Sequence, residues 1–308
     1  MADRNGIVIL GVFVADTTYR AERMPRVGET ILGESFALGP GGKGSNQAVA
    51  AGRLGADVSL ITRLGDDDFG KLAVETWEAA GVRPLVTRAP ESYTGAAFIF
   101  VEAATGDNAI IISPGAAATI GPDDLDAQSG LIGGAAVFMT QLEQPLEAAV
   151  RGMEIARAAG VATILNPAPA RDLDDAVLGL CDYVTPNETE AEALTGIAVG
   201  SLDGARAAAD GLLARGAGAA VITLGAQGAL YHTAARSVLV PAIAAGPVVE
   251  TTGAGDAFNA GFAVGLARGM DPVEAARLGC AVAGVSVTRA GTAASMPGAD
   301  EVAALLAR

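Results

Sequence analysis

Residues 249–261 read VETTGAGDAFNAG, the pattern of a strand end, a glycine turn and the start of a helix. Gly253 and Gly255 allow a tight turn and leave no side chain in front of the first helical N–H groups. Those N–H groups have no partner inside the helix and carry the positive end of its dipole. An anionic oxygen can therefore bind there.

Asp256 stands where this helix begins. A carboxylate would repel a phosphate if the turn only held an anion. It fits a group that takes a proton from a hydroxyl while the glycine amides hold the developing negative charge, as phosphoryl transfer requires. A glycine turn with an aspartate helix cap accounts for the same residues, and this segment alone does not separate the two interpretations.

Composition limits the class of protein. The 308 residues, 51% of them apolar, suffice for one large α/β domain, or for one domain with a small appendage. The net charge of −15 argues against nucleic acid or an anionic membrane surface as a partner. A phosphate site must therefore be made positive locally, by amides, a few Lys or Arg side chains and a bound cation.

The two cysteines and the N-terminal segment bear on the cellular location of the protein. Cys181 and Cys280 are far apart and lack metal-ligand spacing, which favours a reduced, cytoplasmic protein. The apolar run from Ile7 to Leu10 is too short for a signal peptide or a membrane span, so we expect no membrane association.

Two segments interrupt the alternation of strands and helices along the chain. Residues 17–38 are turn-rich, and Thr94–Val101 with Asn108–Ile112 have the composition of a hairpin. Together, inserts at about 17–38 and 94–112 predict a small sheet over the mouth of the main domain, a lid that excludes water. Just before the first insert, Asp16 follows the predicted strand Ile7–Leu10. It is a candidate acceptor for a ligand hydroxyl, or a turn residue.

Residues 39–47 form a glycine loop ahead of an alanine-rich helix. Gly39, Gly41 and Gly44 match the dinucleotide pattern, but no clear strand of a βαβ unit precedes them. Lys43 suggests a phosphate loop, yet Gly44 stands where Ser or Thr is required. We therefore expect close backbone approach to a small polar ligand, with Lys43 and Asn46 donating to its hydroxyls.

Further candidates follow later strands. Glu143 comes after the predicted strand Ala135–Met139 and is a second candidate hydroxyl partner. Asn187 and Glu190 open a helix three residues apart, a spacing suited either to hydrated Mg²⁺ with phosphate oxygens or to a simple capping box. We expect Trp77 in the core, and His232, the single histidine, on the surface of a strand.

The remaining pattern is strands alternating with helices, without repeats or low-complexity linkers. It predicts one α/β domain over residues 1–308, a doubly wound, mostly parallel sheet flanked by helices, with the small β-sheet lid.

In conjunction, these segments resemble the ribokinase (PfkB) family of carbohydrate kinases. The resemblance covers nearly the whole chain in order. The matching segments are GGKGSNQA at 41–48, QLE at 141–143, NPAPA at 166–170, TPNETE at 185–190 and TGAGD at 252–256.

The resemblance implies a ribokinase-like fold and ATP-dependent phosphorylation of the primary hydroxyl of a pentose, ribose at O5. Asp256 matches the family's catalytic base. Its anion hole is matched by Gly253, Ala254 and Gly255. The positions that match sugar contacts are Val14, Asp16, Gly42, Lys43, Gly44, Asn46, Glu143 and Asp256.

The resemblance also assigns nucleotide and metal positions. Those matching nucleotide contacts are Asn187, Thr223, Gly225, Gly228, Gly255 and Cys280. Asn187 and Glu190 match the motif that arranges Mg²⁺ and the phosphates. Those matching the loops around an activating K⁺ are Glu250, Thr252, Ser286, Arg289, Gly291 and Ser295.

Two positions depart from the family pattern. Val14 replaces the usual Asn two residues before Asp16, which removes a polar partner for one sugar hydroxyl. An unpaired buried hydroxyl costs about 1–3 kcal/mol, enough to change substrate preference tenfold or more. We therefore expect weaker ribose binding, or a preference for 2-deoxyribose. Glu250 replaces the usual Asp and places its carboxylate one methylene farther out, which leaves the K⁺ requirement open.

Other functions fit the same resemblance. A kinase for another small sugar or a nucleoside is one alternative, and a catalytically silent sugar-binding protein is another. Asp256 with its complete glycine turn argues against the silent protein. The family is often dimeric through its lid sheet, so we expect a homodimer that binds sugar and ATP.

Overall fold

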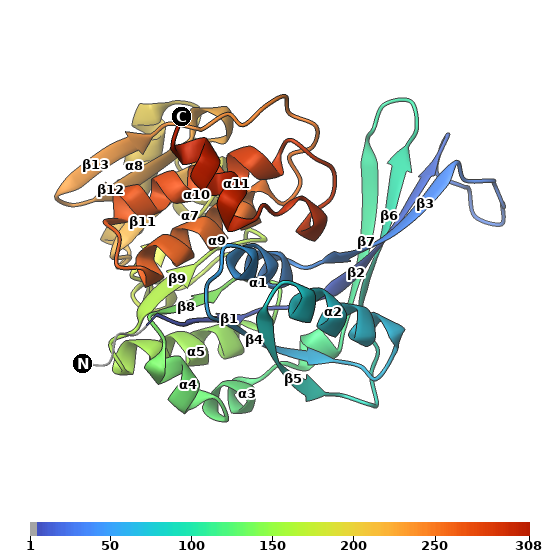
Figure 1. Cartoon of the computed structure of the whole chain (residues 1–308), viewed down its shortest axis with the longest axis horizontal. Helices are drawn as coiled ribbons and strands as arrows, with labels where there is room; N and C mark the ends of the chain where they lie inside the picture. Colours follow the sequence, from blue (N-terminus) through green and yellow to red (C-terminus); the bar gives the residue numbers. More distant parts are fainter. Residues whose placement is uncertain (1–4) are drawn as a thin grey trace.

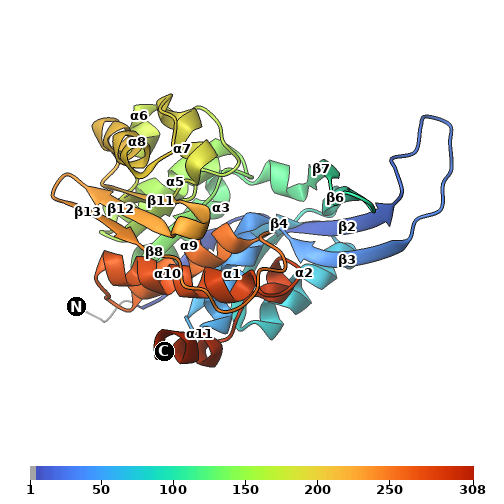
Figure 2. The ribbon, with the colours of Figure 1, turned by 90° about the horizontal axis from the view of Figure 1, so that it is seen from above.

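Two β-sheets organise the structure (Figure 1). The computed structural model describes residues 5–308. A nine-stranded sheet has the order β13-β12-β11-β10-β9-β8-β1-β4-β5, and a four-stranded sheet has the order β3-β2-β6-β7. The helices flank the larger sheet, while the smaller sheet projects away from the body (Figures 1 and 2).

The nine-stranded sheet is parallel from β5 to β11, and β12 and β13 continue it antiparallel at one edge. This confirms the predicted mostly parallel sheet. Its strands are β1 (Ile7–Leu10), β4 (Val58–Leu64), β5 (Val82–Arg88), β8 (Val137–Thr140), β9 (Ala162–Leu165), β10 (Tyr183–Val184), β11 (Ala219–Thr223), β12 (Ala229–Thr233) and β13 (Arg236–Val240).

Helices cover both faces of this sheet. Side chains of β1 alternate between two buried clusters: Ile7 and Ile9 pack with α1, α2, α9, α10 and α11, and Val8 and Leu10 pack with α3 to α8. The sheet is therefore doubly wound, as predicted. The helices are α1 (Lys43–Arg53), α2 (Asp68–Ala79), α3 (Pro122–Asp126), α4 (Ser129–Gly134), α5 (Leu146–Ala158), α6 (Asp175–Leu178), α7 (Glu188–Thr195), α8 (Leu202–Ala214), α9 (Ala254–Ala267), α10 (Pro272–Ser286) and α11 (Ala299–Leu306).

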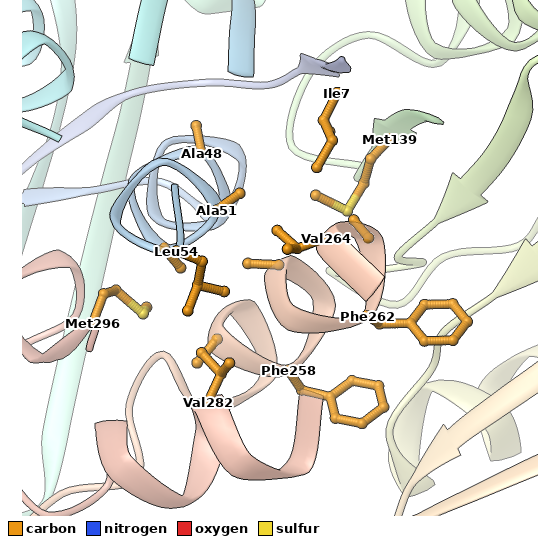
Figure 3. Close-up of a cluster of buried hydrophobic side chains, with 14 of the residues drawn as sticks. Ile7, Ala48, Ala51, Leu54, Met139, Phe258, Phe262, Val264, Val282 and Met296 are labelled. Atoms are coloured by element: carbon orange, nitrogen blue, oxygen red, sulfur yellow. The ribbon is translucent and has the colours of Figure 1, made fainter. Parts of the chain in front are cut away.

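Small residues let α9 and α10 lie close together. A Cβ added to Gly261 of α9 would lie 2.8 Å from the Cα of Gly279 in α10. Phe258 and Val264 of α9 and Leu54, just after α1, belong to the buried apolar cluster on this face of the sheet (Figure 3). The close packing fixes α9, and with it the glycine turn at its start, against α10.

The smaller sheet is the predicted lid, but its strands are longer than expected. They are β2 (Val14–Ala21), β3 (Ser35–Gly41), β6 (Thr94–Glu102) and β7 (Asn108–Gly115). Its segments therefore span residues 14–41 and 94–115, where we predicted 17–38 and 94–112. Asp16 lies inside β2 and not in a turn after β1, because only three residues separate Leu10 from the start of β2 at Val14.

Three kinds of secondary-structure element were not predicted from the sequence. The edge strand β5 contains Pro84, which lowers the strand signal but is tolerated at an edge. Helix α8 contains Gly204 and Gly211, which weaken a helical pattern. The short helices α3, α4 and α6 lack the length needed for a clear periodicity.

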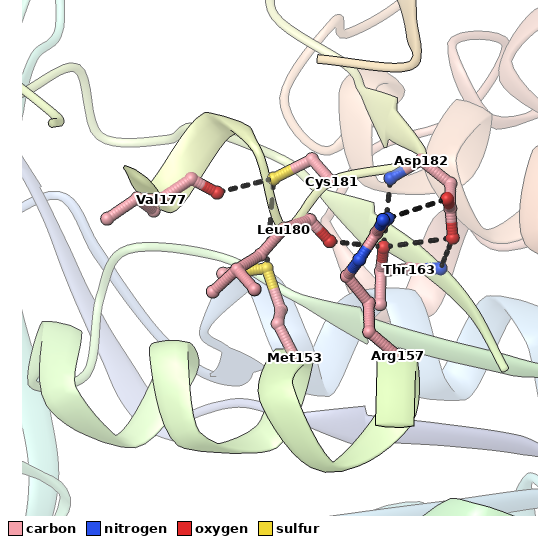
Figure 4. A network of polar contacts seen from close by, with 7 residues as sticks. All are labelled: Met153, Arg157, Thr163, Val177, Leu180, Cys181 and Asp182. Atoms are coloured by element: carbon pink, nitrogen blue, oxygen red, sulfur yellow. Dashed lines mark hydrogen bonds and ion pairs between the residues drawn. The ribbon is translucent and has the colours of Figure 1, made fainter. Parts of the chain in front are cut away.

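A partly exposed polar link joins β9 to the segment before β10 (Figure 4). Asp182 accepts hydrogen bonds from the backbone N–H of Thr163 and from Arg157, both at 2.9 Å. The neighbouring thiol of Cys181 donates to the carbonyl of Val177 at 3.3 Å. Burial raises the pKa of Cys181 to about 12, so this cysteine is a protonated core residue.

The prediction for Trp77 is confirmed and that for His232 is wrong. Trp77 is fully buried. His232 is buried as well, because its two ring nitrogens lie 2.9 Å from Asp210 of α8 and 2.9 Å from Ser237 of β13. Within residues 5–308, no helix has the length and apolar character to cross a bilayer.

Candidate active site

Asp256 is the centre of the candidate site. It occupies the third position of α9, whose N-cap is Gly253, a residue in the left-handed region with φ 82°. The carboxylate does not cap its own helix. It accepts hydrogen bonds from Asn46 at 3.0 Å and from Gln47 at 3.1 Å, both in α1. The interpretation of Asp256 as a simple helix cap is therefore wrong.

The environment of Asp256 suits a base. The residue is only 6% exposed. Burial raises the pKa of its carboxyl group, while the charge of Lys43 and the amide donors of Asn46 and Gln47 act in the opposite direction. The net upward shift makes the carboxylate a better proton acceptor than an exposed aspartate.

The glycine turn leaves space in front of the first turn of α9. A Cβ added to Gly255 would meet no atom within 4 Å. The N–H of Ala254 donates to the carbonyl of Thr251 at 3.1 Å, which closes the turn. Gly255 therefore presents its backbone to an open space beside Asp256, the arrangement that an anion hole needs, while the N–H of Ala254 is used within the turn.

Acidic groups from distant parts of the chain converge on Lys43. The carboxylate of Glu143 accepts the backbone N–H of Lys43 at 2.7 Å. Burial lowers the pKa of Lys43, but the carboxylates of Asp256, Glu143 and Glu190 raise it by more. The lysine is therefore charged and lies among three carboxylates.

Glu143 and Asp16 share this polar enclosure. Burial raises the pKa of Glu143 to about 7, against the opposing effects of Lys43, and burial raises the pKa of Asp16 to about 6. The charges of Asp256 and Asp16 add to the upward shift at Glu143. A carboxylate whose pKa is raised is more basic than an exposed one, so in its ionised form it is a stronger hydrogen-bond acceptor for ligand hydroxyls.

The glycine loop permits these close approaches. Gly42 has φ 90°, and its added Cβ would collide with the carbonyl of Val12. An added Cβ on Gly44 would lie 2.5 Å from the Cα of Gly11, so the start of α1 rests directly on the end of β1. An added Cβ on Gly41 would collide with the carboxylate of Asp16. The predicted close backbone approach is thus present, with Asn46 and Lys43 beside it.

Val14 lies on the same face of β2 as Asp16, two residues away. It is 7% exposed and belongs to a buried apolar cluster with Val12 and Ala97. The position where the family usually carries Asn is therefore an apolar wall in this chain.

The candidate nucleotide residues form a second group. Asn187 and Thr223 pair as a parallel bridge, which places the start of α7 beside the end of β11. Gly225 and Gly228 both have positive φ, at 52° and 107°. Cys280 is buried, its Sγ lies 4.0 Å from the carbonyl of Val240, and burial raises its pKa to about 12.

The capping box at the start of α7 is present. The side chain of Asn187 accepts the N–H of Glu190 at 2.8 Å, and Glu190 accepts the N–H of Asn187 at 2.9 Å. The capping interpretation is therefore confirmed. It uses the single side-chain oxygen of Asn187 and one of the two carboxylate oxygens of Glu190. The charge of Glu190 also raises the pKa of Lys43, so it reaches the enclosure.

The two loops of the candidate K⁺ site are joined. Glu250 accepts the backbone N–H of Gly291 at 2.9 Å, and its own N–H donates to the carbonyl of Val287 at 3.2 Å. Ser295 donates to the carbonyl of Thr292. Of the other predicted residues, Ser286 donates to Ala283 within α10, Arg289 pairs with Glu301, and Thr252 is exposed in the turn.

Sequence reasoning assigned no role to four residues that the structure places around the site. Gln47 and Asn166 lie in quoted motifs, and their burial as polar residues is the signal that would have singled them out. Thr292 donates to the carbonyl of Pro40 at the end of β3, and Arg53 donates to the carbonyls of Ala293 and Met296. No local pattern in the sequence predicts the contacts of Thr292 and Arg53.

Comparisons with known proteins agree with this geometry. The model of the pfkB family carbohydrate kinases matches residues 4–299. The deoxyribokinase of Salmonella typhi is 37% identical over 297 residues, 96% of each chain. The ribokinase of Haemophilus influenzae is 36% identical over 299 residues, 97% of each chain.

A solved structure shares the whole fold. The structure of Arabidopsis thaliana ribokinase complexed with ribose and ATP superposes with a TM-score of 0.93 at 31% identity, covering 98% of this chain and 99% of that one. The family model and these full-length relatives together show that this chain belongs to the pfkB family of carbohydrate kinases, phosphotransferases with an alcohol group as acceptor.

Proposed function

We propose that this protein transfers the γ-phosphoryl group of ATP to the primary hydroxyl of a pentose, converting D-ribose to D-ribose 5-phosphate. The observation that carries the proposal is the buried carboxylate of Asp256, held by two amides beside an open glycine turn. The similar Arabidopsis thaliana ribokinase is complexed with ribose and ATP, which supports the same pair of substrates here.

The chemistry follows from the arrangement of the site. The hydroxyl oxygen of the sugar bonds to the γ-phosphorus while its proton passes to Asp256. The bond from that phosphorus to the bridging oxygen breaks, and ADP leaves. The amides of Gly253 and Gly255 would face the charge that develops on the transferred group, and that of Ala254 would join them on releasing the carbonyl of Thr251. Asp16, Glu143, Lys43 and Asn46 would fix the other hydroxyls, which orients the primary hydroxyl.

A second candidate substrate is 2-deoxyribose. Val14 offers no polar atom on the face that it shares with Asp16, so a sugar that lacks one hydroxyl loses nothing there. Overall identity does not discriminate between the two sugars, because the deoxyribokinase and the ribokinase are 37% and 36% identical to this chain.

The acidic enclosure fits a divalent cation. Three carboxylates surround one lysine, so the enclosure carries excess negative charge before the phosphates of ATP enter. Asn187 and Glu190 would hold Mg²⁺ through its water shell, since Glu190 keeps one oxygen outside the capping box and the single side-chain oxygen of Asn187 keeps a second lone pair. Mg²⁺ would neutralise phosphate charge during transfer.

The loop pair at Glu250 fits a K⁺ ion. The Glu250–Gly291 hydrogen bond brings together two loops rich in backbone and side-chain oxygen, the ligand type that K⁺ takes. The residues that would contribute are Glu250, Thr252, Ser286, Arg289, Gly291 and Ser295. The loop containing Glu250 leads straight into the glycine turn, so an ion there would stiffen the anion hole.

We also propose that the protein acts as a cytoplasmic homodimer joined through the lid. The lid exposes large apolar side chains on its projecting strands, among them Phe36 and Ile111, at 58% and 65% exposure. Such side chains are usually covered in an assembly. Both cysteines are free and buried, which suits a reducing compartment.

The test is ADP release with Mg-ATP across ribose, 2-deoxyribose, fructose, 2-keto-3-deoxygluconate and adenosine, in K⁺ and in Na⁺ salts. We expect turnover on a pentose, abolished in Asp256→Asn, and faster in K⁺. Turnover on adenosine or a hexose alone would replace the pentose assignment. No turnover on any substrate, together with sugar-dependent thermal shifts, would favour a binding protein.

A further inference from the structure

Two consecutive side chains of α1 hold the carboxylate of Asp256. Asn46 donates to one oxygen at 3.0 Å, and Gln47 donates to the other at 3.1 Å. Asn46 also belongs to the proposed sugar contacts. Gln47 is completely buried, so it faces the protein interior and not the sugar.

The orientation of the Gln47 amide is determined by its partners. Its Nε2 donates to Asp256 and to the Oδ1 of Asn166, both at 3.1 Å, and both acceptors require the nitrogen on that side. Its Oε1 accepts the Nε2 of Gln141 at 2.5 Å. Both N–H groups of this amide and one lone pair of its oxygen therefore have identified partners.

The partners of Gln47 are themselves fixed. Asn166 donates to the carbonyl of Thr185 at 3.0 Å, which ties it to the chain just after β10. The Oε1 of Gln141 fills the notch between Gly11 and Gly44, where added Cβ atoms would lie 3.0 and 2.8 Å from it. The network thus anchors Gln47 to the ends of several parallel strands.

We propose that Gln47 is a positioning residue that holds the carboxylate of Asp256 in the orientation required for proton transfer from the substrate hydroxyl. The inference rests on the proposed function, because it concerns the same base. The terminal torsion of an aspartate side chain has a broad preference, so the side chain alone does not fix the carboxylate plane. One donor on each oxygen does fix it, and leaves further lone pairs for the hydroxyl.

The same hydrogen bond bears on the charge of the base. A donor to a buried carboxylate favours its ionised form against the effect of burial. Removal of the donor from Gln47 should raise the pKa of Asp256 further. The base would then be protonated at a higher pH, and the acid limb of the pH–rate profile would move upward.

Gln47→Leu and Gln141→Leu form a matched pair for the test. Both remove the hydrogen bond between Gln47 and Gln141 and bury a leucine in the same network, but only Gln47→Leu removes the donor to Asp256. Gln47→Met, which keeps an unbranched stem, is made alongside in case leucine prevents folding. Thermal unfolding of each variant reports its structural cost.

For Gln47→Leu we expect kcat to fall about tenfold to a hundredfold, the value of a hydrogen bond to a charged group. Its sugar KM should stay near that of the wild type, and the acid limb of kcat/KM should move to higher pH. For Gln141→Leu we expect neither the shift of the limb nor the large loss of kcat. An equal loss of kcat in both variants with an unmoved limb would overturn the proposal, as would a loss confined to KM.

A readout without turnover separates this inference from the proposed function. In protein labelled with ¹³C at the aspartate carboxyl carbons, the Asp256 resonance is assigned by its absence in Asp256→Asn. Its titration midpoint should rise in Gln47→Leu and stay unchanged in Gln141→Leu. If the wild type phosphorylates no sugar but the midpoint rises, the proposed substrate fails while the Gln47 contact stands. An unmoved midpoint overturns the inference in either case.

Discussion

The carboxylate of Glu143 accepts the backbone N–H of Lys43, the first residue of α1, at 2.7 Å. An acid at a helix N-terminus is favoured by the helix dipole. Even so, burial raises the pKa of this carboxyl group to about 7, and the charges of two further acids in the enclosure, Asp256 and Asp16, add to the shift. The site without substrate therefore carries electrostatic strain.

The first prediction concerns pH and stability. Between about pH 4.5 and 7 the folded state binds more protons at Glu143 than the unfolded chain does, so the free energy of unfolding falls as the pH rises. Glu143→Gln removes this dependence. We expect the loss of stability from pH 5 to 8, measured by urea unfolding without substrate, to be smaller in the variant by about 2 kcal/mol. The exposed Glu147→Gln is the control, and equal slopes in wild type and Glu143→Gln would contradict the prediction.

The second prediction concerns Asp256→Asn. The variant keeps the shape of the side chain but cannot accept a proton, so kcat should fall about 10²- to 10⁴-fold. ADP release measures the loss. Ribose should still raise the thermal midpoint of the variant, since Asp16, Glu143 and Lys43 are unchanged. Substantial residual turnover would show that another group takes the proton.

The third prediction concerns the sugar pocket. Val14→Asn adds donor and acceptor atoms on the face shared with Asp16, and should lower the KM for ribose about tenfold or more. The KM for 2-deoxyribose should change less. Thr18→Asn, farther along the same face of β2, is the control. If the ratio of the two KM values is the same before and after Val14→Asn, the side chain at position 14 does not meet the distinguishing hydroxyl.

The fourth prediction tests the contact between α1 and β1. In Gly44→Ala the added methyl would lie 2.5 Å from the Cα of Gly11, and backbone must move to admit it. We expect a loss of about 1–3 kcal/mol in the free energy of unfolding, together with weaker sugar binding. Gly130→Ala, where an added Cβ meets nothing within 4 Å, should be neutral. Chemical denaturation of both variants measures the free energy of unfolding. An unchanged value in Gly44→Ala would show that the backbone around Gly11 can move at little cost.

The fifth prediction concerns assembly. Phe36 of β3 and Ile111 of β7 lie on one face of the lid and are 58% and 65% exposed. We expect a dimer by light scattering, and a monomer for the double variant Phe36→Glu with Ile111→Glu, because charged side chains oppose burial. Val248→Glu, an exposed apolar position outside the lid, should stay dimeric. A wild-type monomer, or a dimeric double variant, would exclude this face as the interface.

Local sequence patterns predicted most of the large sheet and the catalytic turn. Buried parallel strands are short apolar runs, and the turn before α9 needs glycine in the left-handed region at Gly253, so both leave a signal within a few residues. Strand β5 gave less signal, since an edge strand with Pro84 is half-buried and irregular in composition.

Contacts between distant residues were not predictable in this way. Gln47 reaches Asp256 across 209 residues of sequence, and the Thr292–Pro40 bond spans 252 residues. His232 was placed on the surface because its strand looks like an edge hairpin, but helix α8 supplies Asp210 to cover it. The burial and hydrogen bonding of such residues depend on partners that are distant in the sequence.

Trp77 is the single tryptophan of the chain, and its ring nitrogen donates to the hydroxyl of Ser45 at 2.9 Å. Its ring also meets Phe13 edge to face, with centroids 5.8 Å apart. Ser45 lies between Gly44 and Asn46, and Phe13 directly precedes Val14, so the indole touches the direct neighbours of residues on both sides of the proposed sugar site. The fluorescence of Trp77 therefore reports on this region without an added label. A change in fluorescence on mixing with a sugar would give the rate of sugar binding in the absence of phosphoryl transfer.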